Sequence, residues 1–547
     1  MYQPARADLV LRNGKIVTMD ETNPIVEALA VRGNRIVALG PNERIDPLVG
    51  PATRCLDLEG TLAIPGIIDS HCHPDSAVLA RNRYSLAPPE VNSMEQLLAL
   101  VRRETANLPK DQWFLGAGFN NIRLGGYPSR EQLDRVSNGR PVFLHRMDGH
   151  VGIANSRAFE IMGIPEDVKD PPHGSFDRDP SSGHLTGVVR ERAFYLFRQT
   201  FFSEMKPEDY VAGLPHVFRD YLSAGITSVH SSVVRPPVLQ AYQILRREDR
   251  LNMRVGVLAS GEDPHMSEAL VRAGFRAGFG DEWLQLKGVE WTADASISGR
   301  TAAFYEPYVG EPDRGEPTPN RGMVLYDRKD LEARVSAVHQ AGLQVCLEGL
   351  GDRGIDFALD IMEAALRSYP VDHHRMRIEH CCYVPPPQRA RMKALGVIDS
   401  SGTGFLHDLG DIYRLNRGEK AMRFMFPHRS LIDEGIPAAG HSDHPVCTYN
   451  PFVAMWSMAS RQSLTGDDMG QEERVTIEEA LYAYTVLGAY AGKEEHMKGR
   501  LRPGMLADMA ILDRDIFRVD LDAVRQTRVL ATILDGKVRH GEKHFPR

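Results

Sequence analysis

The chain has 547 residues, which is too long for one compact core, so a large domain and a smaller one are expected. Its formal net charge of -8 is spread without long runs of one sign, which argues against nucleic acid and a membrane surface as partners. The six cysteines show no paired spacing, the start has no signal-peptide core, and no apolar run could span a bilayer. These features predict a cytoplasmic protein without a disulfide framework.

Both ends of the chain have the pattern of short β-strands. Residues Leu9–Thr18 form two apolar runs around Asn13-Gly14, which is a strong hairpin signal. Similar runs and turns continue to about residue 62, and the tail from 499 to 547 resembles them. We predict that segments 1–62 and 499–547 pair into one small β-sandwich.

The middle of the chain, residues 63–498, alternates apolar strands with helical stretches, which indicates an α/β fold and a (β/α)8 TIM barrel. The strand candidates are Ile64–Ile68, Val142–His145, Thr227–His230, Arg254–Leu258, Leu284–Glu290, Gln344–Leu347, Arg377–His380, Val397–Ser400 and Ile436–Gly440. One candidate is surplus, and we exclude Val142–His145 because it lies in a long insertion around residues 76–202. An insertion of that length usually has its own structure and shapes the site.

Two histidines follow the first strand candidate. His71 and His73 are two residues apart, so in an extended backbone their side chains point to the same face. Neutral imidazole is a common ligand for zinc, and a barrel of parallel strands places its chemistry at the carboxyl ends of the strands. The pair therefore predicts a metal site, although two surface histidines in a turn are the plainer interpretation.

Polar side chains also end four of the other strand candidates. Glu290, Glu348 and His380 close their strands, and Asp443 follows the last strand in a tight turn. One such residue alone more often caps a helix or packs by hydrogen bonding. Because several strand ends of one barrel carry them together, we interpret them with the two histidines as a metal centre.

A series of ordered motifs runs along nearly the whole chain. The motifs are Asn13-Gly14-Lys15-Ile16, Pro65–His73, Asp148-Gly149-His150, Asn155-Ser156, Thr186-Gly187 with Glu191, Asp294–Ala302, Gly351-Asp352-Arg353, Arg377–His380, Ser442–Val446, Tyr484-Thr485 and Gly504–Asp508. In these motifs the sequence resembles the amidohydrolase superfamily, in the branch that includes N-substituted formamide deformylases.

The resemblance implies a barrel combined with a β-sandwich, and metal ligands at His71, His73, His380 and Asp443. In the family this aspartate takes a proton from water activated by the metal and later passes it to the leaving group. That chemistry is consistent with a carboxylate serving as general base and then as general acid. The candidate ligands, three histidines and up to three carboxylates, predict one or two divalent ions per chain, with zinc first and manganese or iron as alternatives.

Two positions depart from the family pattern. Glu290 stands where many relatives have a lysine that can be carboxylated, and a glutamate could bridge two metals without modification. Lys287, three residues earlier, is expected to face the other side of the strand. Glu348 stands where relatives have a histidine, so it is either a metal ligand or a catalytic acid or base.

Other histidines are candidates for binding a small-molecule substrate. His150 is the first choice, because the resemblance suggests that its motif in the insertion reaches the pocket, and His145 lies near it. The alternative is that His150 only fixes a loop. His230 could line the pocket from the end of its strand, and His444 could contact substrate or orient Asp443.

We therefore predict a metal-dependent hydrolase that cleaves the C–N bond of an amide, an N-formyl or N-acyl amine, or a cyclic amide. The first alternative is a metal-assisted non-hydrolytic reaction on the same scaffold, such as C–C cleavage, decarboxylation, hydration or isomerisation. The second is a relative without catalytic activity. A homodimer is compatible with the fold, since large barrels often pair.

Overall fold

Eight parallel strands form the centre of the molecule, in a computed structural model that describes residues 6–81, 83–87, 90–203, 205–312 and 316–544. Their order in the sheet follows the chain: β8 (Ile67–Cys72), β15 (Ile226–Val233), β16 (Arg254–Ser260), β18 (Leu284–Thr292), β19 (Gln344–Gly349), β20 (Arg377–His380), β21 (Ile398–Ser401) and β22 (Ala438–Gly440). The hydroxyl of Ser70 donates to the carbonyl of Gly440 over 3.0 Å, which links the first strand to the last. The predicted TIM barrel is confirmed, including the exclusion of Val142–His145.

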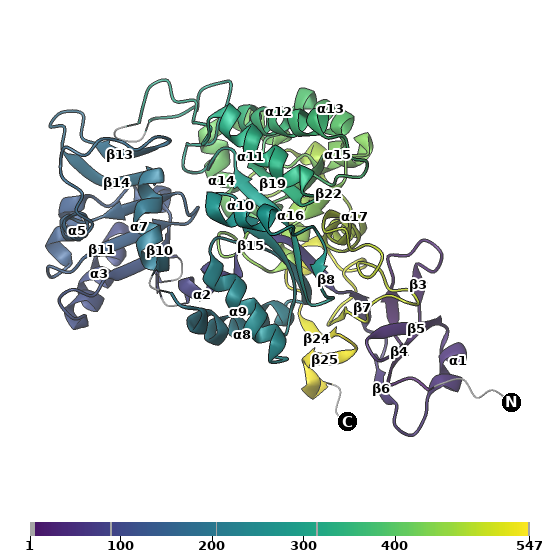
Figure 1. Cartoon of the computed structure of the whole chain (residues 1–547). Coiled ribbons are helices and arrows are strands. Elements are labelled where there is room, and N and C mark those ends of the chain that lie inside the picture. Colours follow the sequence, from purple (N-terminus) through teal and green to yellow (C-terminus); the bar gives the residue numbers. More distant parts are fainter. Residues whose placement is uncertain (1–5, 82, 88–89, 204, 313–315, 545–547) are drawn as a thin grey trace.

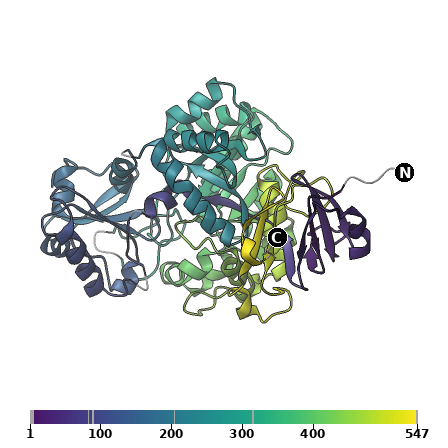
Figure 2. The same ribbon diagram turned by 90° about the horizontal axis from the view of Figure 1, so that it is seen from below.

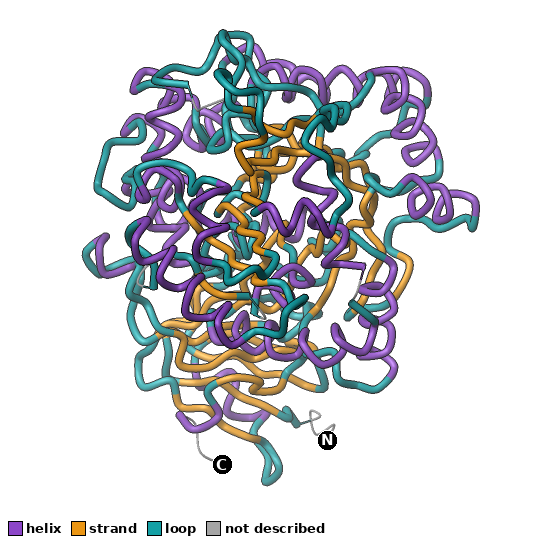
Figure 3. Tube along the Cα trace, turned by 90° about the vertical axis from the view of Figure 1, so that its left-hand side faces the viewer, coloured by secondary structure: helices purple, strands orange, loops and turns teal. Residues whose placement is uncertain are grey.

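Helices cover the outside of these strands (Figure 3). The main ones are α8 (Pro207–Ser223), α9 (Pro236–Arg247), α10 (Pro264–Arg272), α11 (Arg328–Gln340), α12 (Asp352–Ser368), α13 (Pro386–Leu395), α14 (Phe405–Arg417), α15 (His428–Glu434), α16 (Pro451–Ser460) and α17 (Ile477–Tyr482). Helix α12 shows why they form, because Ile355 and Leu359 lie one turn apart and both pack in one core with Leu347 of β19. None of the described helices is long and apolar enough to cross a bilayer.

The first barrel strand differs from its expected form. We expected one strand over Ile64–Ile68, but the chain changes sheets at Gly66. Strand β7 (Leu62–Pro65) pairs with strands from the two ends of the chain, whereas β8 pairs with β15. The prediction of a single strand is wrong, because an unbroken apolar run does not reveal a change of hydrogen-bonding partner.

Replacement of Gly66 by alanine should destabilise this junction. A Cβ atom at Gly66 would lie 2.2 Å from the Thr227 hydroxyl and 2.6 Å from its methyl group. We expect the free energy of unfolding to fall by about 1–3 kcal/mol in Gly66→Ala, measured by urea denaturation. Adding Thr227→Ala should restore part of the loss, and Gly404→Ala is the control, since its nearest neighbour would lie at 3.9 Å. An unchanged midpoint in Gly66→Ala would contradict the packing.

Strands from both ends of the chain share a sheet, as the sequence predicts. The six-stranded sheet has the order β25-β24-β23-β7-β2-β3, and β7 lies between a strand from each end. A four-stranded sheet, β5-β4-β1-β6, packs beside it through a common apolar core. The strands are β1 (Leu9–Arg12), β2 (Lys15–Val17), β3 (Ile25–Val26), β4 (Ala28–Arg32), β5 (Arg35–Gly40), β6 (Arg54–Asp57), β23 (Met509–Leu512), β24 (Val529–Leu534) and β25 (Lys537–His540).

The long insertion has a sheet of its own, with the order β13-β14-β12-β11-β10-β9. Its elements are β9 (Tyr84–Ser85), α3 (Met94–Asn107), β10 (Phe114–Phe119), α4 (Asn121–Leu124), α5 (Arg130–Val136), β11 (Val142–Arg146), β12 (Val151–Ala154), α6 (Ser156–Ile161), β13 (Gly174–Arg178), β14 (Leu185–Glu191) and α7 (Arg192–Ser203). The excluded strand candidate is β11. The insertion and the terminal sheets lie at opposite ends of the molecule, with the barrel between them (Figures 1 and 2).

Candidate metal centre

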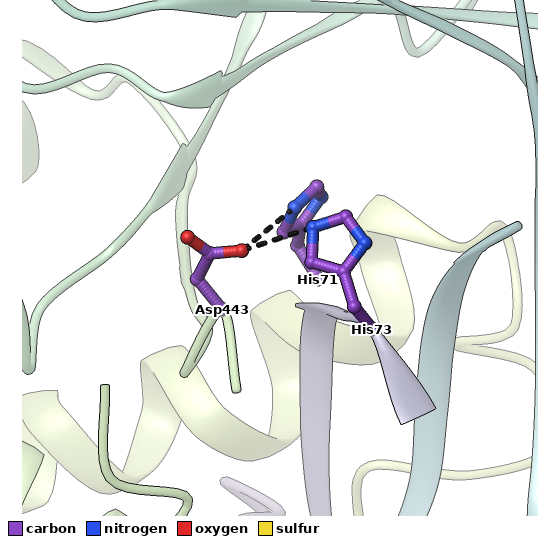
Figure 4. A group of neighbouring side chains, drawn as sticks. All are labelled: His71, His73 and Asp443. Carbon is purple, nitrogen blue, oxygen red and sulfur yellow. Dashed lines mark ion pairs between the residues drawn. The ribbon is translucent and has the colours of Figure 1, made fainter. Parts of the chain in front are cut away.

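Two histidines and an aspartate meet at the carboxyl ends of the first and last barrel strands (Figure 4). His71 belongs to β8, His73 precedes helix α2 (Pro74–Ala80), and Asp443 follows β22. The Oδ1 atom of Asp443 lies 3.3 Å from Nε2 of His71 and 3.1 Å from Nε2 of His73. The backbone N–H of Asp443 donates to the carbonyl of His71 over 3.0 Å, which holds the turn against β8.

A second group shares His71. It consists of His71, Glu348 at the end of β19 and His380 at the end of β20. Within each group the side chains offer one potential ligand atom apiece, and these atoms lie within 4.8 Å of one another. The structure therefore brings together five of the six predicted ligands in two sets that could each hold a metal ion.

Several buried atoms in this cluster have no hydrogen-bond partner among the described residues. They are both ring nitrogens of His71, Nδ1 of His73, Nδ1 of His380, Oδ1 of Asp443, both carboxylate oxygens of Glu290, and Oε2 of Glu379. Burying polar groups without partners is costly, and carboxylate and imidazole atoms are typical metal ligands. The residues present therefore fit a bound divalent ion.

The negative charge of the carboxylates in the cluster favours binding of a cation. Burial opposes protonation of His71, but the carboxylates of Glu290, Asp443 and Glu379 outweigh it and raise the pKa of His71 well above its usual range. Burial likewise opposes ionisation of Asp443, but His380, His71 and His73 hold its pKa well below the usual range. The neighbouring groups thus keep the aspartate as a carboxylate.

The sixth predicted ligand, Glu290, lies outside both groups. Its Oε1 atom is 3.3 Å from Nδ1 of His71, whereas Asp443 faces the other ring nitrogen, Nε2. Burial, followed by the charges of Glu348 and Glu379, raises the pKa of Glu290 well above its usual range, although His71 opposes this. Its proposed role as a bridge between two metals remains a prediction.

Metal analysis of paired variants would test the role of Glu290. We expect Glu348→Gln to lower the bound metal per chain more than Glu290→Gln, because only Glu348 belongs to a group of potential ligands. A carboxylate that acts only through a ligand histidine typically affects metal affinity by about 10- to 100-fold. Elemental analysis after dialysis measures both, and an equal loss in the two variants would instead identify Glu290 as a direct ligand.

The structure adds residues that the sequence interpretation missed. Glu379 places Oε2 3.4 Å from Nδ1 of His71, and its carboxylate pairs with Arg377. The ring of His441, two residues before Asp443, lies 5.0 Å from that of His71 and 5.1 Å from that of His380, measured between centroids. The sequence did contain an indication of these residues. Arg377, Glu379 and His380 fall within four positions of one predicted strand, and several polar residues on one buried strand are unusual.

The expected orientation of Lys287 needs correction. Lys287 was expected to face away from the barrel interior, but β18 has a register shift against β16 at this point. Its Nζ atom donates to the carbonyl of Gly492 over 2.9 Å and lies 3.0 Å from Oε1 of Glu494. The other oxygen of Glu494 lies 3.5 Å from the ring of His230, so Lys287 belongs to the buried interior network.

The predicted substrate-binding histidines have different surroundings. His230 is fully buried, and Nδ1 lies 3.0 Å from the Arg377 guanidinium. His444 places Nδ1 2.9 Å from the Tyr221 hydroxyl. His145 is buried in the insertion beside Arg83, with Nδ1 3.4 Å from the guanidinium.

His150, unlike the buried His145 and His230, is partly exposed, with 19% of its side chain accessible. It lies between β11 and β12, and Nδ1 is 2.9 Å from the buried carboxylate of Glu191. Burial opposes its protonation, but Glu191, Asp148 and Glu348 raise the pKa of His150 to about 9. Glu348, a member of the second ligand group, is thus one of the carboxylates whose charge acts on the His150 ring.

Comparison with known proteins agrees with this fold. The profile of the Amidohydrolase family matches residues 54–540. An N-substituted formamide deformylase from Arthrobacter pascens is 28% identical over 539 residues, which cover 97% of this chain and 98% of that protein. The protein LONG AFTER FAR-RED 3 from Arabidopsis thaliana is 30% identical over 545 residues, covering 97% of this chain and 91% of that protein.

Solved structures show the same architecture. An uncharacterized metal-dependent hydrolase from Pyrococcus horikoshii aligns with a TM-score of 0.75 and 25% identity, covering 94% of this chain and 99% of that one. A second such hydrolase, from Pyrococcus furiosus, aligns with a TM-score of 0.72 and 28% identity, covering 93% and 100% of the two chains.

Proposed function

Since the chain belongs to the amidohydrolase family, we propose that it is a metal-dependent hydrolase that cleaves a C–N bond of a small molecule. The substrate class is an N-formyl or N-acyl amine, another amide or a cyclic amide. The observation that carries the proposal is the set of buried imidazole and carboxylate atoms without hydrogen-bond partners among the described residues at the barrel mouth. The deformylase similarity supports the choice of a C–N bond.

His71, His73 and Asp443 would hold one ion, and Glu348 and His380 would join His71 around a second position. A divalent ion held there lowers the pKa of a water molecule toward ~7 and polarises a carbonyl group. Zinc is the first candidate, and the additional carboxylate also suits manganese or iron.

Asp443 is the proposed general base and general acid. It is a carboxylate at neutral pH because the surrounding histidines lower its pKa, so Oδ1 can accept a proton from the attacking water. The same proton can then pass to the departing nitrogen of the substrate. Glu348 would serve as a ligand or as a second acid or base near the same carbonyl carbon.

Metal removal and restoration would test this function. We expect protein stripped with a chelator to have no turnover on a panel of N-formyl amines, N-acyl amines and cyclic amides. Activity should return with zinc, manganese or ferrous iron at one or two ions per chain, measured by release of the amine. Turnover by the stripped protein would contradict the proposal, and so would activity confined to carbonyl compounds that have no hydrolysable bond.

A further inference from the structure

Three sequence motifs that play no part in the ligand groups converge in the structure. His150 lies in the turn between β11 and β12, Glu191 ends β14, and Thr301 lies in the loop that follows β18. The Nδ1 atom of His150 lies 2.9 Å from Oε2 of Glu191, and the hydroxyl of Thr301 donates to Oε1 of Glu191 over 2.6 Å. Both oxygens of the carboxylate therefore have a partner.

Glu191 is held in a conformation that few residues other than glycine adopt. Its φ angle is +48°, and its side chain is fully buried. Backbone in this region often marks a functional position, because the surrounding structure must maintain it. Here it turns the carboxylate toward His150 at the point where β14 passes into α7.

The loop after β18 joins this unit to the metal centre. The backbone N–H of Ala293 donates to the carbonyl of Glu348 over 3.0 Å, and Asp294 accepts the N–H of Leu350 over 2.8 Å. In the same loop, the hydroxyl of Ser296 donates to Asp148, two residues before His150, over 2.8 Å. A single short stretch thus fixes the position of His150 relative to the end of β19.

The second ring nitrogen of His150 is available to a ligand. Glu191 occupies Nδ1, and within the part of the chain that the structure describes Nε2 makes no hydrogen bond, although 19% of the side chain is exposed. The charged and titratable neighbours of the ring are Asp148 in its own turn, Glu191 on β14, Tyr195 on α7 and Glu348 on β19. Three of these are carboxylates, so the ring keeps a proton on Nε2 at neutral pH.

We propose that His150 is a catalytic residue that donates a hydrogen bond from Nε2 to the carbonyl oxygen of the scissile bond, and that Glu191 positions it. This inference rests on the proposed hydrolase function. Charge develops on that oxygen as water adds to the carbonyl carbon, so a fixed cationic donor stabilises the transition state more than the bound substrate. Thr301 donates a hydrogen bond to Glu191 and so affects His150 only through that carboxylate.

The first test is the kinetics of His150→Leu, which removes the hydrogen-bond donor. We expect kcat to fall by about 100-fold with little change in KM, as is typical when one donor to a developing oxyanion is removed. The metal content should stay at the wild-type value, because His150 is in neither ligand group. A raised KM with unchanged kcat would overturn the proposal, since it would mean contact with an oxygen that does not react.

The second test is the pH dependence of Glu191→Gln. In the wild type, kcat/KM should fall as pH rises through about 9, where His150 loses its proton. The variant should lose activity at lower pH, toward the ordinary histidine value of about 6.5. Thr301→Val should shift the same limb in the same direction by a smaller amount. The control is Glu166→Gln, which removes the carboxylate beside the exposed His184 in the same insertion and should leave the profile unchanged.

A measurement without turnover separates this inference from the proposed function. In metal-free protein labelled with carbon-13 at histidine Cε1, the signal missing from His150→Leu identifies the ring, and its titration should move down in Glu191→Gln. Hydrolysis with no shift in either readout would overturn the role of Glu191. Absence of hydrolysis in the wild type would instead count against the proposed function, whatever the titration shows.

Discussion

Asp443→Asn should reduce kcat by about 10²- to 10⁴-fold, the usual contribution of a general acid–base group. The proposed roles of this carboxylate are to bind the metal and to carry the proton. Oδ1 faces the rings of His71 and His73, and the group is ionised at neutral pH. Asparagine keeps the shape of the side chain but cannot accept the proton of the attacking water. Turnover of the amide substrate at saturating metal measures the loss.

Controls must show whether a loss of activity comes from the missing proton carrier, from loss of the bound metal or from unfolding. Metal content and thermal midpoint should be measured on the same preparation of Asp443→Asn. Asp372→Asn is the matched control, since Asp372 is exposed, and it should retain wild-type kcat. Full activity in Asp443→Asn would rule out this residue as the proton carrier.

Arg377→Met should lower the free energy of unfolding by about 3–5 kcal/mol, because it leaves a buried carboxylate without its cation. Arg377 is fully buried, pairs with Glu379, and donates to the carbonyl of Ser70 over 2.7 Å. Burial opposes ionisation of Glu379, but Arg377 and His71 hold the pKa of that carboxyl below its usual range. Urea denaturation of the metal-free protein gives the change without a contribution from bound ion.

A second substitution tests the cause of this effect. Adding Glu379→Gln to Arg377→Met should recover part of the lost stability, because the uncompensated charge is removed. Arg81→Met is the surface control, since Arg81 and Asp220 form an exposed ion pair, and it should cost less than about 1 kcal/mol. A similar cost for the buried and surface variants would show that the interior pair is not important for folding.

Much of the architecture could be predicted because parallel strands buried on both faces read as short apolar runs. The strands around Arg254 and Gln344 are of this kind, and both lie in the barrel. Polar residues at strand ends also identified Glu348 on β19 and His380 on β20. The change of sheet at Gly66 could not be predicted, because Ile64 and Ile67 are equally apolar although they pair with different strands.

The side chains that were missed have a common physical reason. Simple alternation places neighbours such as Glu379 and His380 on opposite faces of a strand. His380 has a φ angle of +66°, so the chain turns there and both side chains reach His71. A register shift at Lys287 has a similar effect on β18. Such departures from simple alternation depend on tertiary contacts, which cannot be inferred from the sequence of one strand.

The position of β7 also determines when the protein can finish folding during its synthesis. Strand β7 leads through Gly66 into β8, which carries His71, but its antiparallel partner β23 begins only at Met509. A ribosome must therefore translate the whole barrel before β7, which leads to the candidate ligand His71, can pair with its second neighbouring strand. Until then β7 has an unpaired edge in the nascent chain, and such edges are open to wrong partners. The histidine pair near the start of the sequence thus depends on strands that are made last.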